Sequence, residues 1–238
     1  MNERYARQML LSEIGESGQV RLAKAKVLVV GVGGLGSPLT MALVGAGVGT
    51  IGLVDYDVVS LSNLHRQLLY FEEEIGKSKV DCAAKRLKNM NSEVTINTYN
   101  IMFDSSNARG IIANYDMVVD ACDNFNTRYL LDELCAEFNI PYIYGAIRGF
   151  EGQVSVFDYR YANNEIIQTY RTLYPTELTD DVLGDPSLKA VVSMSAGIIA
   201  NVQAAEVLKL ICNFGKSLIG ILWTYNILTN ESCCYKLT

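Results

Sequence analysis

Charged and amide side chains follow two apolar, strand-like stretches of this chain. The stretch over 50–57 carries Asp55 and Asp57 near its end and is followed by Asn63, Arg66 and Gln67. Lys77 and Lys79 come next, and the stretch over 116–122 carries Asp120 and is followed by Asp123, Asn124 and Arg128. Carboxylates beside cations suit phosphoryl or nucleotidyl transfer, because negative charge grows on phosphate oxygens and on the leaving pyrophosphate. Hydride transfer needs fewer charged groups, because the cofactor carries that chemistry.

Several of these residues also have a plain structural interpretation. Lys77 fits a solvated lysine at the start of a helix, and Lys79 taken alone could be the same. Arg128 fits a residue on a helix face, and Asp120 fits a hydrogen-bonded structural acid inside an apolar strand. His65 is the only histidine, and we assign it no catalytic role.

A glycine cluster precedes these residues and could bind a nucleotide. Gly31, Gly33 and Gly36 match G-x-G-x-x-G between an apolar strand and a helix that should begin near Leu35. Such glycines let the main chain approach a phosphate, and the helix N-terminus offers free N–H groups to the anion. Asp55 ends the next strand, where an acid would bind ribose hydroxyls. An NAD enzyme and an ATP enzyme could both use this loop, but it is not a Walker A motif.

The elements that must position these residues alternate between strand and helix. Residues 2–25 look helical. Strands are expected over 26–30, 50–57, 94–100, 116–122 and 141–147. Helices are expected over 35–46, 77–91 and 126–139, with a helix or turn over 105–115. This alternation predicts βαβ units, a mostly parallel Rossmann-like sheet, and helices on both faces.

The pattern changes after Arg148. Residues 152–159 alternate as an antiparallel strand does. The polar segment 160–190 should contain a mobile loop at 175–186. A long, mostly buried helix is expected over 195–212, and a hairpin over 220–237 turning near 229–231. We expect one domain over 1–238, with a nucleotide-binding part at 1–148 and an antiparallel, crossover-loop and long-helix part at 149–238.

Composition excludes some classes of function. The chain has 238 residues, 50% of them hydrophobic, and a formal net charge of −6, which argues against a nucleic-acid binder. The N-terminus does not read as a signal peptide, and no stretch of 18 uninterrupted apolar residues predicts a membrane span. We therefore expect a cytoplasmic protein. The six cysteines form no C-x-x-C pair and are expected to be buried free thiols.

Ordered motifs over nearly the whole chain resemble one family. They are RYARQ, VLVVGVGGLGSP, GVGTIGLVDYDVVSLSNLHRQ, GKSKV, VVDACDNFNTR, GAIRGFEGQVSVF and QAAEVLKL. Together they resemble the ThiF/MoeB/HesA family, the bacterial relatives of ubiquitin-activating enzymes. Members of that family use Mg-ATP to adenylate the C-terminal Gly-Gly carboxylate of a small ubiquitin-like sulfur-carrier protein, with release of pyrophosphate. The adenylate is then normally converted to a thiocarboxylate for thiamin or molybdopterin synthesis.

The resemblance implies roles for individual residues. Gly33 and Gly34 would contact phosphate, Asp55 would hold ribose, and Asp123 would hold Mg²⁺. Arg7 would reach into the site of a partner subunit, which implies a homodimer. The expected catalytic set is Arg7, Arg66, Lys79 and Asp123. The expected nucleotide-binding set is Gly31, Gly33, Gly34, Gly36, Asp55, Asp57, Asn63, Arg66, Gln67, Lys79, Asp123 and Asn124.

The chemistry agrees with this inventory. A C-terminal carboxylate has a pKa of about 3.5, so it is already ionised at pH 7 and needs no general base. The site must instead reduce the repulsion between carboxylate and phosphate and place the two in line.

The sequence departs from the family pattern in two places. Many members bind a structural zinc through two C-x-x-C pairs. Here the first pair is replaced by Thr169 and Thr172, and only adjacent Cys233 and Cys234 remain near the C-terminus. Threonine hydroxyls are poor zinc ligands, so no zinc site is expected. Residues 160–190 contain no cysteine, so we expect adenylation without a covalent step on this chain, and sulfur from a separate donor protein.

Three alternatives remain open on the sequence alone. The chain could adenylate a peptide or another carboxylate in natural-product synthesis. It could be an NAD-dependent oxidoreductase, although the cluster of cations and acids then has no clear task. It could also be a non-catalytic scaffold. The strand 152–159 and the mobile loop are the candidate surfaces for a carrier protein.

Overall fold

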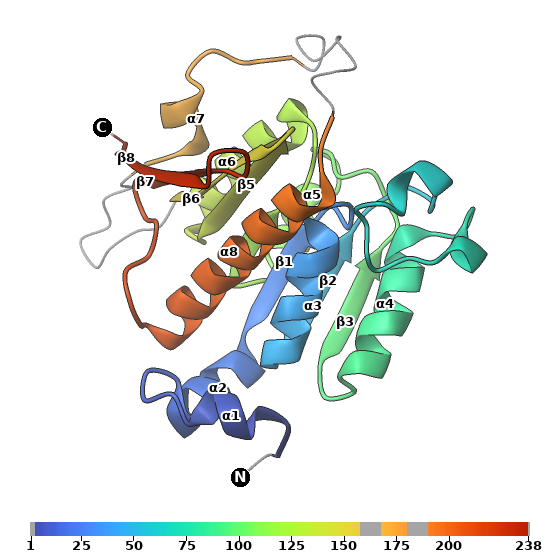
Figure 1. Ribbon diagram of the computed structural model, residues 1–238, viewed down its shortest axis with the longest axis vertical. Helices are drawn as coiled ribbons and strands as arrows, with labels where there is room; N and C mark the ends of the chain where they lie inside the picture. The colour runs from blue at the N-terminus through green and yellow to red at the C-terminus, as the bar shows by residue number, and fades with distance from the viewer. Residues whose placement is uncertain (1–2, 158–167, 180–189, 238) are drawn as a thin grey trace.

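The computed structural model describes residues 3–157, 168–179 and 190–237. In this part of the chain, eight strands form one sheet in the order β3-β2-β1-β4-β5-β6-β7-β8 (Figure 1). The first five in sequence pair in parallel, and β6, β7 and β8 are antiparallel. The expected Rossmann-like fold, with an antiparallel C-terminal extension, is confirmed. In chain order, β1 to β8 are Lys26–Val30, Thr50–Val54, Thr95–Tyr99, Met117–Asp120, Tyr142–Arg148, Glu151–Phe157, Ile221–Asn226 and Glu231–Lys236.

Helices cover both faces of the sheet (Figure 1). One face carries α3 (Gly36–Ala46), α4 (Lys79–Met90) and α8 (Ser193–Cys212), and the other carries α5 (Ala108–Ile112) and α6 (Phe125–Phe138). The central strand β4 is buried along its whole length because helices cover both of its faces. The carboxyl ends of β1, β2 and β4, with the loops that follow them, are therefore the part of the sheet left open for a ligand.

Two apolar layers separate the helices from the sheet. The first lies under α3 and α8 and includes Leu39, Leu43 and Val207, all fully buried. The second lies under α5 and α6 and is rich in rings, with Tyr142 and Phe157 fully buried. Among the described residues, α8 alone is long and apolar enough to cross a membrane, and half of its apolar stretch is buried within the molecule. Its contacts with α3, β5 and β6 are those of a core helix.

The N-terminal segment is not one continuous helix. It forms a 3₁₀ turn at Glu3–Tyr5, α1 at Ala6–Met9 and α2 at Gly15–Lys24. The break comes at turns over 10–14, and Gly15 has a positive φ of 53° that suits glycine. These helices lie near the start of β1, at the end of the sheet opposite the open strand ends (Figure 1).

The C-terminal part follows the predicted plan. The strand expected over 152–159 is β6, which pairs with β5, and the expected hairpin is formed by β7 and β8. All six residues of β8 are exposed, and β8 ends the sheet. The loop expected at 175–186 lies largely outside the described residues. The described segment 168–179 contains one short helix, α7, at Tyr170–Leu173.

Candidate nucleotide site

The glycine loop after β1 is pressed against the loop after β4. Gly31 has φ of 94°, and a Cβ there would overlap the main chain of Ala121. A Cβ at Gly36 would overlap the carbonyl of Gly31. These two glycines therefore allow the close approach that sets the start of α3 against the end of β1.

Gly33 and Gly34 face the loop that follows β2. A Cβ at Gly33 would lie 3.4 Å from Gln67 Nε2, and one at Gly34 would lie 3.5 Å from Arg66 Cδ. Neither glycine is needed to avoid an overlap. Their bare main chain therefore leaves room beside Arg66 and Gln67, as a phosphate cradle requires.

Asp55 is tied to the glycine loop. Its Oδ2 accepts a hydrogen bond from the N–H of Val32 at 2.8 Å, and its Oδ1 accepts one from the N–H of Asp57 at 2.9 Å. The Tyr70 hydroxyl donates to the carbonyl of Val32 at 2.7 Å. Burial, with a smaller contribution from the charge of Asp55, raises the pKa of Tyr70. This hydroxyl therefore stays protonated and holds the glycine loop in place.

Lys79 begins α4 and reaches back toward β2. Its Nζ lies 2.8 Å from Asp57 Oδ2, and the N–H of Lys79 donates to the carbonyl of Asp57 at 3.0 Å. The lysine side chain is 5% exposed, whereas that of Asp57 is 51% exposed. Ser78 caps the helix by accepting from the N–H of Asp81. The ammonium group is therefore held near the strand ends with one half-exposed counter-ion.

A short 3₁₀ helix at Leu61–Asn63 positions the next polar residues. The carbonyl of Asn63 accepts the N–H groups of Arg66 and Gln67, both at 3.0 Å. Arg66 Nη1 lies 3.0 Å from the carbonyl of Ser62 and 2.8 Å from His65 Nε2. The side chain of Gln67 is buried, and its Oε1 has no partner among the described residues. Gln67 Nε2, not Oε1, is the amide atom nearest the Cβ position of Gly33.

The loop after β4 carries one buried and one exposed acid. Asp120 is fully buried, as the structural interpretation of this residue predicted. Asp123 is exposed, and Asn124 caps α6 by accepting from the N–H of Thr127 at 2.8 Å. The charge of Asp57, burial, and the charges of Asp123 and Asp55 raise the pKa of Tyr56. Acids from the loop after β2 and from the loop after β4 thus both affect the Tyr56 hydroxyl, so the two loops lie at the same end of the sheet.

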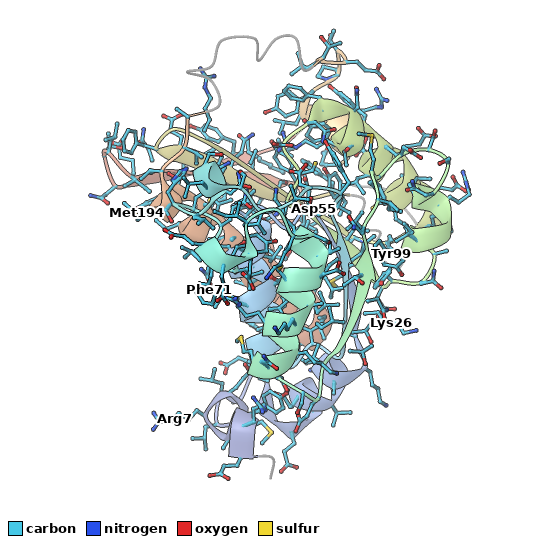
Figure 2. The ribbon with its side chains drawn as sticks, turned by 90° about the vertical axis from the view of Figure 1, so that its right-hand side faces the viewer. Arg7, Lys26, Asp55, Phe71, Tyr99 and Met194 are labelled. Carbon is cyan, nitrogen blue, oxygen red and sulfur yellow. The ribbon has the colours of Figure 1, made fainter. Side chains whose placement is uncertain are left out.

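Arg7 is the one predicted site residue that lies elsewhere. It is exposed on α1, lies at the other end of the molecule from Asp55, and points away from the body of the chain (Figure 2). It does not join the cluster of its own chain. The other predicted residues come from the glycine loop and the loops after β2 and β4, and lie at the open strand ends.

Thr169 and Thr172, which replace the first cysteine pair of the family pattern, take part in hydrogen bonds. Thr169 and Thr172 form a capping box at the start of α7, and the N–H of Thr169 donates to Thr172 Oγ1 at 3.2 Å. Gln168 Nε2 donates to the carbonyl of Leu237 at 3.1 Å, which ties this segment to the end of β8. The main-chain N–H of Tyr170 donates to Asp132 on α6. Polar groups of segment 168–179 thus hold it to β8 and α6 through hydrogen bonds.

The expectation of buried cysteines is partly wrong. Cys82, Cys135 and Cys212 are buried, and Cys122 is half-buried. Cys233 and Cys234 are exposed, because the apolar run that contains them forms the last strand of the sheet, where helices give no cover.

Sequence reasoning missed Arg128 and Gln203. Arg128 was interpreted as a helix-face residue, but it is buried and forms an ion pair with Asp120 at 3.1 Å. The signal was available, since Arg128 precedes Leu131 and Cys135 at helical spacing on the apolar side of α6. Gln203, fully buried on α8, donates from Nε2 to the carbonyl of Asp120 at 2.7 Å. No motif pointed to it.

The residues present fit ATP and Mg²⁺. The glycine cradle, Arg66 and Lys79 suit phosphates, because bare main chain and cations favour an anion. The described residues contain no cluster of three or more potential metal ligands. Mg²⁺ bound with a nucleotide usually takes one or two carboxylates together with phosphate oxygens, and Asp123 is the exposed carboxylate that could serve. A surface hollow of about 740 Å³ along β3 is lined by Thr95, Thr98 and neighbours, and lies apart from these residues.

Comparison with known proteins gives close relatives. The sulfur carrier protein adenylyltransferase of Thermus thermophilus is 42% identical over 236 residues, covering 99% of this chain and 86% of that protein. A probable molybdopterin-synthase adenylyltransferase of Gracilaria tenuistipitata var. liui is 42% identical over 235 residues, covering 99% of this chain. This chain spans only 64% of the length of that relative.

A solved structure shares the fold. Escherichia coli MccB with ATP aligns over 100% of this chain and 72% of its own, with a TM-score of 0.85 and 22% identity. The NAD-dependent alternative has no support among these relatives. A family model described as the ThiF family matches residues 5–237. The chain therefore belongs to the ThiF family.

Proposed function

We propose that the protein adenylates the C-terminal carboxylate of a small ubiquitin-like sulfur-carrier protein that ends in Gly-Gly, using ATP and releasing pyrophosphate. The observation that supports the proposal is that Arg66, Lys79 and Asp123 come from elements at the same end of the sheet as the glycine loop. The similarity to the Thermus sulfur carrier protein adenylyltransferase, at 42% identity, supports the proposal.

The substrate ATP would lie across this end of the sheet. Gly33 and Gly34 would cradle phosphates, while Gly31 and Gly36 shape the loop. Asp55 would exchange a main-chain partner for ribose hydroxyls, and Asn63, Arg66, Gln67 and Lys79 would line the triphosphate. Asp57 would orient Lys79, and Asn124 would fix the start of α6 beside Asp123. Bound at Asp123, Mg²⁺ would neutralise charge on the phosphate oxygens.

The reaction needs no base from the protein. The carrier carboxylate is ionised at neutral pH, so its oxygen can attack the α-phosphorus once repulsion from the phosphates is lowered. The P–O bond to pyrophosphate breaks as the acyl-adenylate bond forms. Arg66 and Lys79 supply the positive charge that this step requires, and the sole histidine, His65, is exposed and contacts Arg66. The side chains thus act by charge and placement.

The remaining parts of the proposal concern assembly and pathway. Arg7 would complete the site of a second subunit, which makes the functional unit a homodimer. A separate donor would supply the sulfur for thiamin or molybdopterin synthesis, and the reaction would take place in the cytoplasm. The described part of the expected mobile loop, residues 175–179, is the candidate surface for the carrier.

Pyrophosphate exchange into ATP tests the proposal directly. Candidate Gly-Gly carriers from the same genome are mixed with the protein, Mg²⁺, ATP and labelled pyrophosphate. Carrier-dependent label in ATP is the expected result, because adenylate formation is reversible. A matched carrier that lacks its last glycine serves as the control. Binding of ATP without exchange for any carrier would contradict the proposal, and exchange with a short peptide instead would favour the peptide alternative.

Mixed dimers test the role of Arg7. Arg7→Ala and Asp123→Ala should each be inactive alone, and a mixture should recover part of the activity, because one site per mixed dimer keeps both residues. The two variants carry different tags so that mixed dimers can be isolated. No activity in isolated mixed dimers would contradict the action of Arg7 across subunits.

A further inference from the structure

A buried ion pair lies directly beneath the exposed Asp123. Asp120 ends β4 and is fully buried, and Arg128 on α6 is 9% exposed. Arg128 Nε donates to Asp120 Oδ2 at 3.1 Å, and the Tyr142 hydroxyl donates to the same oxygen at 2.9 Å. Both charged groups are thus covered by protein, so neither is placed to touch ATP.

Both members of the pair bind the main chain of Cys122, the residue before Asp123. The N–H of Cys122 donates to Asp120 Oδ1 at 2.9 Å. Arg128 Nη2 donates to the carbonyl of Cys122 at 3.0 Å. The pair therefore holds both hydrogen-bonding groups of one residue, and fixes the direction in which the chain enters Asp123.

The rest of the loop has little freedom. Ala121 is packed against Gly31, where no side chain would fit. Asn124 is held by its hydrogen bond from the N–H of Thr127. Of the three polar side chains in this loop, those of Cys122 and Asn124 are hydrogen-bonded, and within the described part of the chain that of Asp123 makes no hydrogen bond or ion pair. A rigid main chain thus carries one free carboxylate.

Stability alone does not account for a charged pair at this position. Replacing a buried ion pair by apolar residues of similar volume is often neutral or stabilising. A guanidinium group, however, has five donors in a fixed plane, so one side chain can serve a carboxylate and a main-chain carbonyl together. The arrangement gives geometry that an apolar pair could not give.

We propose that Asp120 and Arg128 are positioning residues, which hold the main chain at Cys122 so that the Asp123 carboxylate faces the Mg²⁺ bound with ATP. This inference rests on the proposed role of Asp123, but not on the identity of the carboxylate that is adenylated. Partners of metal-binding groups typically change metal affinity or activity by about 10- to 100-fold when they are removed.

Equilibrium ATP binding with Mg²⁺ and with EDTA gives a readout that needs no carrier and no turnover. The double variant Asp120→Asn with Arg128→Met removes both charges together, which leaves no buried charge unpaired. Arg128→Lys keeps the charge but cannot reach Asp120 and Cys122 at once, and it serves where the double variant does not fold. Tyr142→Phe is the matched control, since it removes a hydrogen bond to Asp120 and leaves both contacts to Cys122.

The tightening of ATP binding by Mg²⁺ should fall by about 10- to 100-fold in both Arg128 variants. In these variants the remaining tightening by Mg²⁺ should be close to that of Asp123→Ala, while the affinity for ATP in EDTA changes by less than about threefold. Tyr142→Phe should keep the tightening within about twofold. In exchange assays, the Mg²⁺ concentration for half-maximal rate should rise in the Arg128 variants while the KM for the carrier stays near that of the wild type.

A folded Arg128 variant that keeps the full effect of Mg²⁺ would overturn the inference. So would a wild-type protein whose ATP affinity does not respond to Mg²⁺, or a Tyr142→Phe variant as impaired as the Arg128 variants. Failure of the proposed function would look different, because the wild-type protein would then bind Mg-ATP and show no carrier-dependent exchange.

Discussion

The loops after β2 and β4 begin alike and differ in one respect. Each opens with an aspartate whose Oδ1 accepts the N–H two residues later, Asp57 for Asp55 and Cys122 for Asp120. Each then presents a more exposed acid. Asp120, however, is fully buried against Arg128, whereas Asp55 is half-buried and its other oxygen meets only a main-chain N–H.

The different partners of Asp55 and Asp120 suggest different roles for the two loops, although both loops begin with the same turn. A carboxylate with a buried guanidinium partner is committed to the fold, because releasing it would leave a charge unpaired. A carboxylate held only by main-chain N–H groups at a half-buried position can exchange one of them for a ligand at low cost. The loop after β4 is therefore a rigid support, and the loop after β2 is an adaptable binding surface.

The largest expected effect compares Asp120→Ala with Asp55→Ala. Loss of Asp120 should lower the free energy of unfolding by about 3–5 kcal/mol, because the guanidinium of Arg128 stays buried without its partner. Loss of Asp55 should lower it by about 1–3 kcal/mol, because two main-chain N–H groups lose an acceptor near solvent. Urea unfolding followed by circular dichroism measures both. Equal losses would contradict the distinction between the two loops.

The glycine loop sharpens the comparison, because it touches both loops. Gly31→Ala places a methyl group against Ala121 at a positive φ, and should cost about 1–3 kcal/mol of stability or more. Gly34→Ala meets only Arg66 Cδ at 3.5 Å, an ordinary contact, so it should stay within about 0.5 kcal/mol. The melting temperatures of the two variants, from thermal unfolding, show which of them is less stable. A Gly34 variant as unstable as the Gly31 variant would show that the β2 side is packed as tightly as the β4 side.

A smaller effect is expected for the exposed acid of the β2 loop. Asp57→Asn should change the free energy of unfolding by less than about 1 kcal/mol, because the Asp57 carboxylate is half-exposed. It should weaken ATP binding by less than about tenfold, or about 1.4 kcal/mol, since Lys79 keeps its charge and loses only its anchor. Calorimetric titration with ATP measures this. Lys79→Ala is the comparison and should lose more; an equal loss would contradict the anchoring role of Asp57.

The smallest effect concerns the thiol of Cys122. Burial, followed by the charge of Asp120, raises the pKa of this thiol well above its usual range, so little thiolate is present near pH 8. Iodoacetamide should modify Cys233 and Cys234 first and leave Cys122 nearly unmodified, as peptide mass spectrometry can follow. Asp120→Asn should speed the reaction of Cys122 and make it proceed at lower pH, because a charge that raises the pKa is removed. Rapid labelling of wild-type Cys122 would contradict the raised pKa of its thiol.

The sequence predicted the parallel half of the molecule and the loops that carry the candidate site. Uninterrupted apolar runs identify the central strands, and the acids after Val54 and Asp120 follow from where such strands end. Burial of Arg128 was not foreseen, because a charge on a helix is usually solvated and only the tertiary fold supplies its partner. The break before Gly15 was not predicted, although the helix-spaced stretches 3–11 and 18–25 leave residues 12–17 between them.

Other features depend on the whole sheet and could not be read from local pattern. The exposure of Cys233 and Cys234 follows from the place of β8 at the end of the sheet. The position of Arg7 follows from the packing of α1 and α2 near the start of β1. The sequence shows the cysteines and the arginine, but segments far away in sequence determine which of their neighbours surround them in the fold.

The open edge of β8 has a practical consequence for measuring oligomeric state. An exposed strand at the end of a sheet can pair with the same strand of another copy, which joins two sheets edge to edge. Such pairing would bring the exposed thiols of Cys233 and Cys234 on two chains together, and air oxidation could then lock the pair as a disulfide. Protein stored without a reductant should therefore contain covalent dimers on non-reducing gels. A dimer that brings Arg7 to a second site should persist in dithiothreitol, whereas an edge-linked one should dissociate.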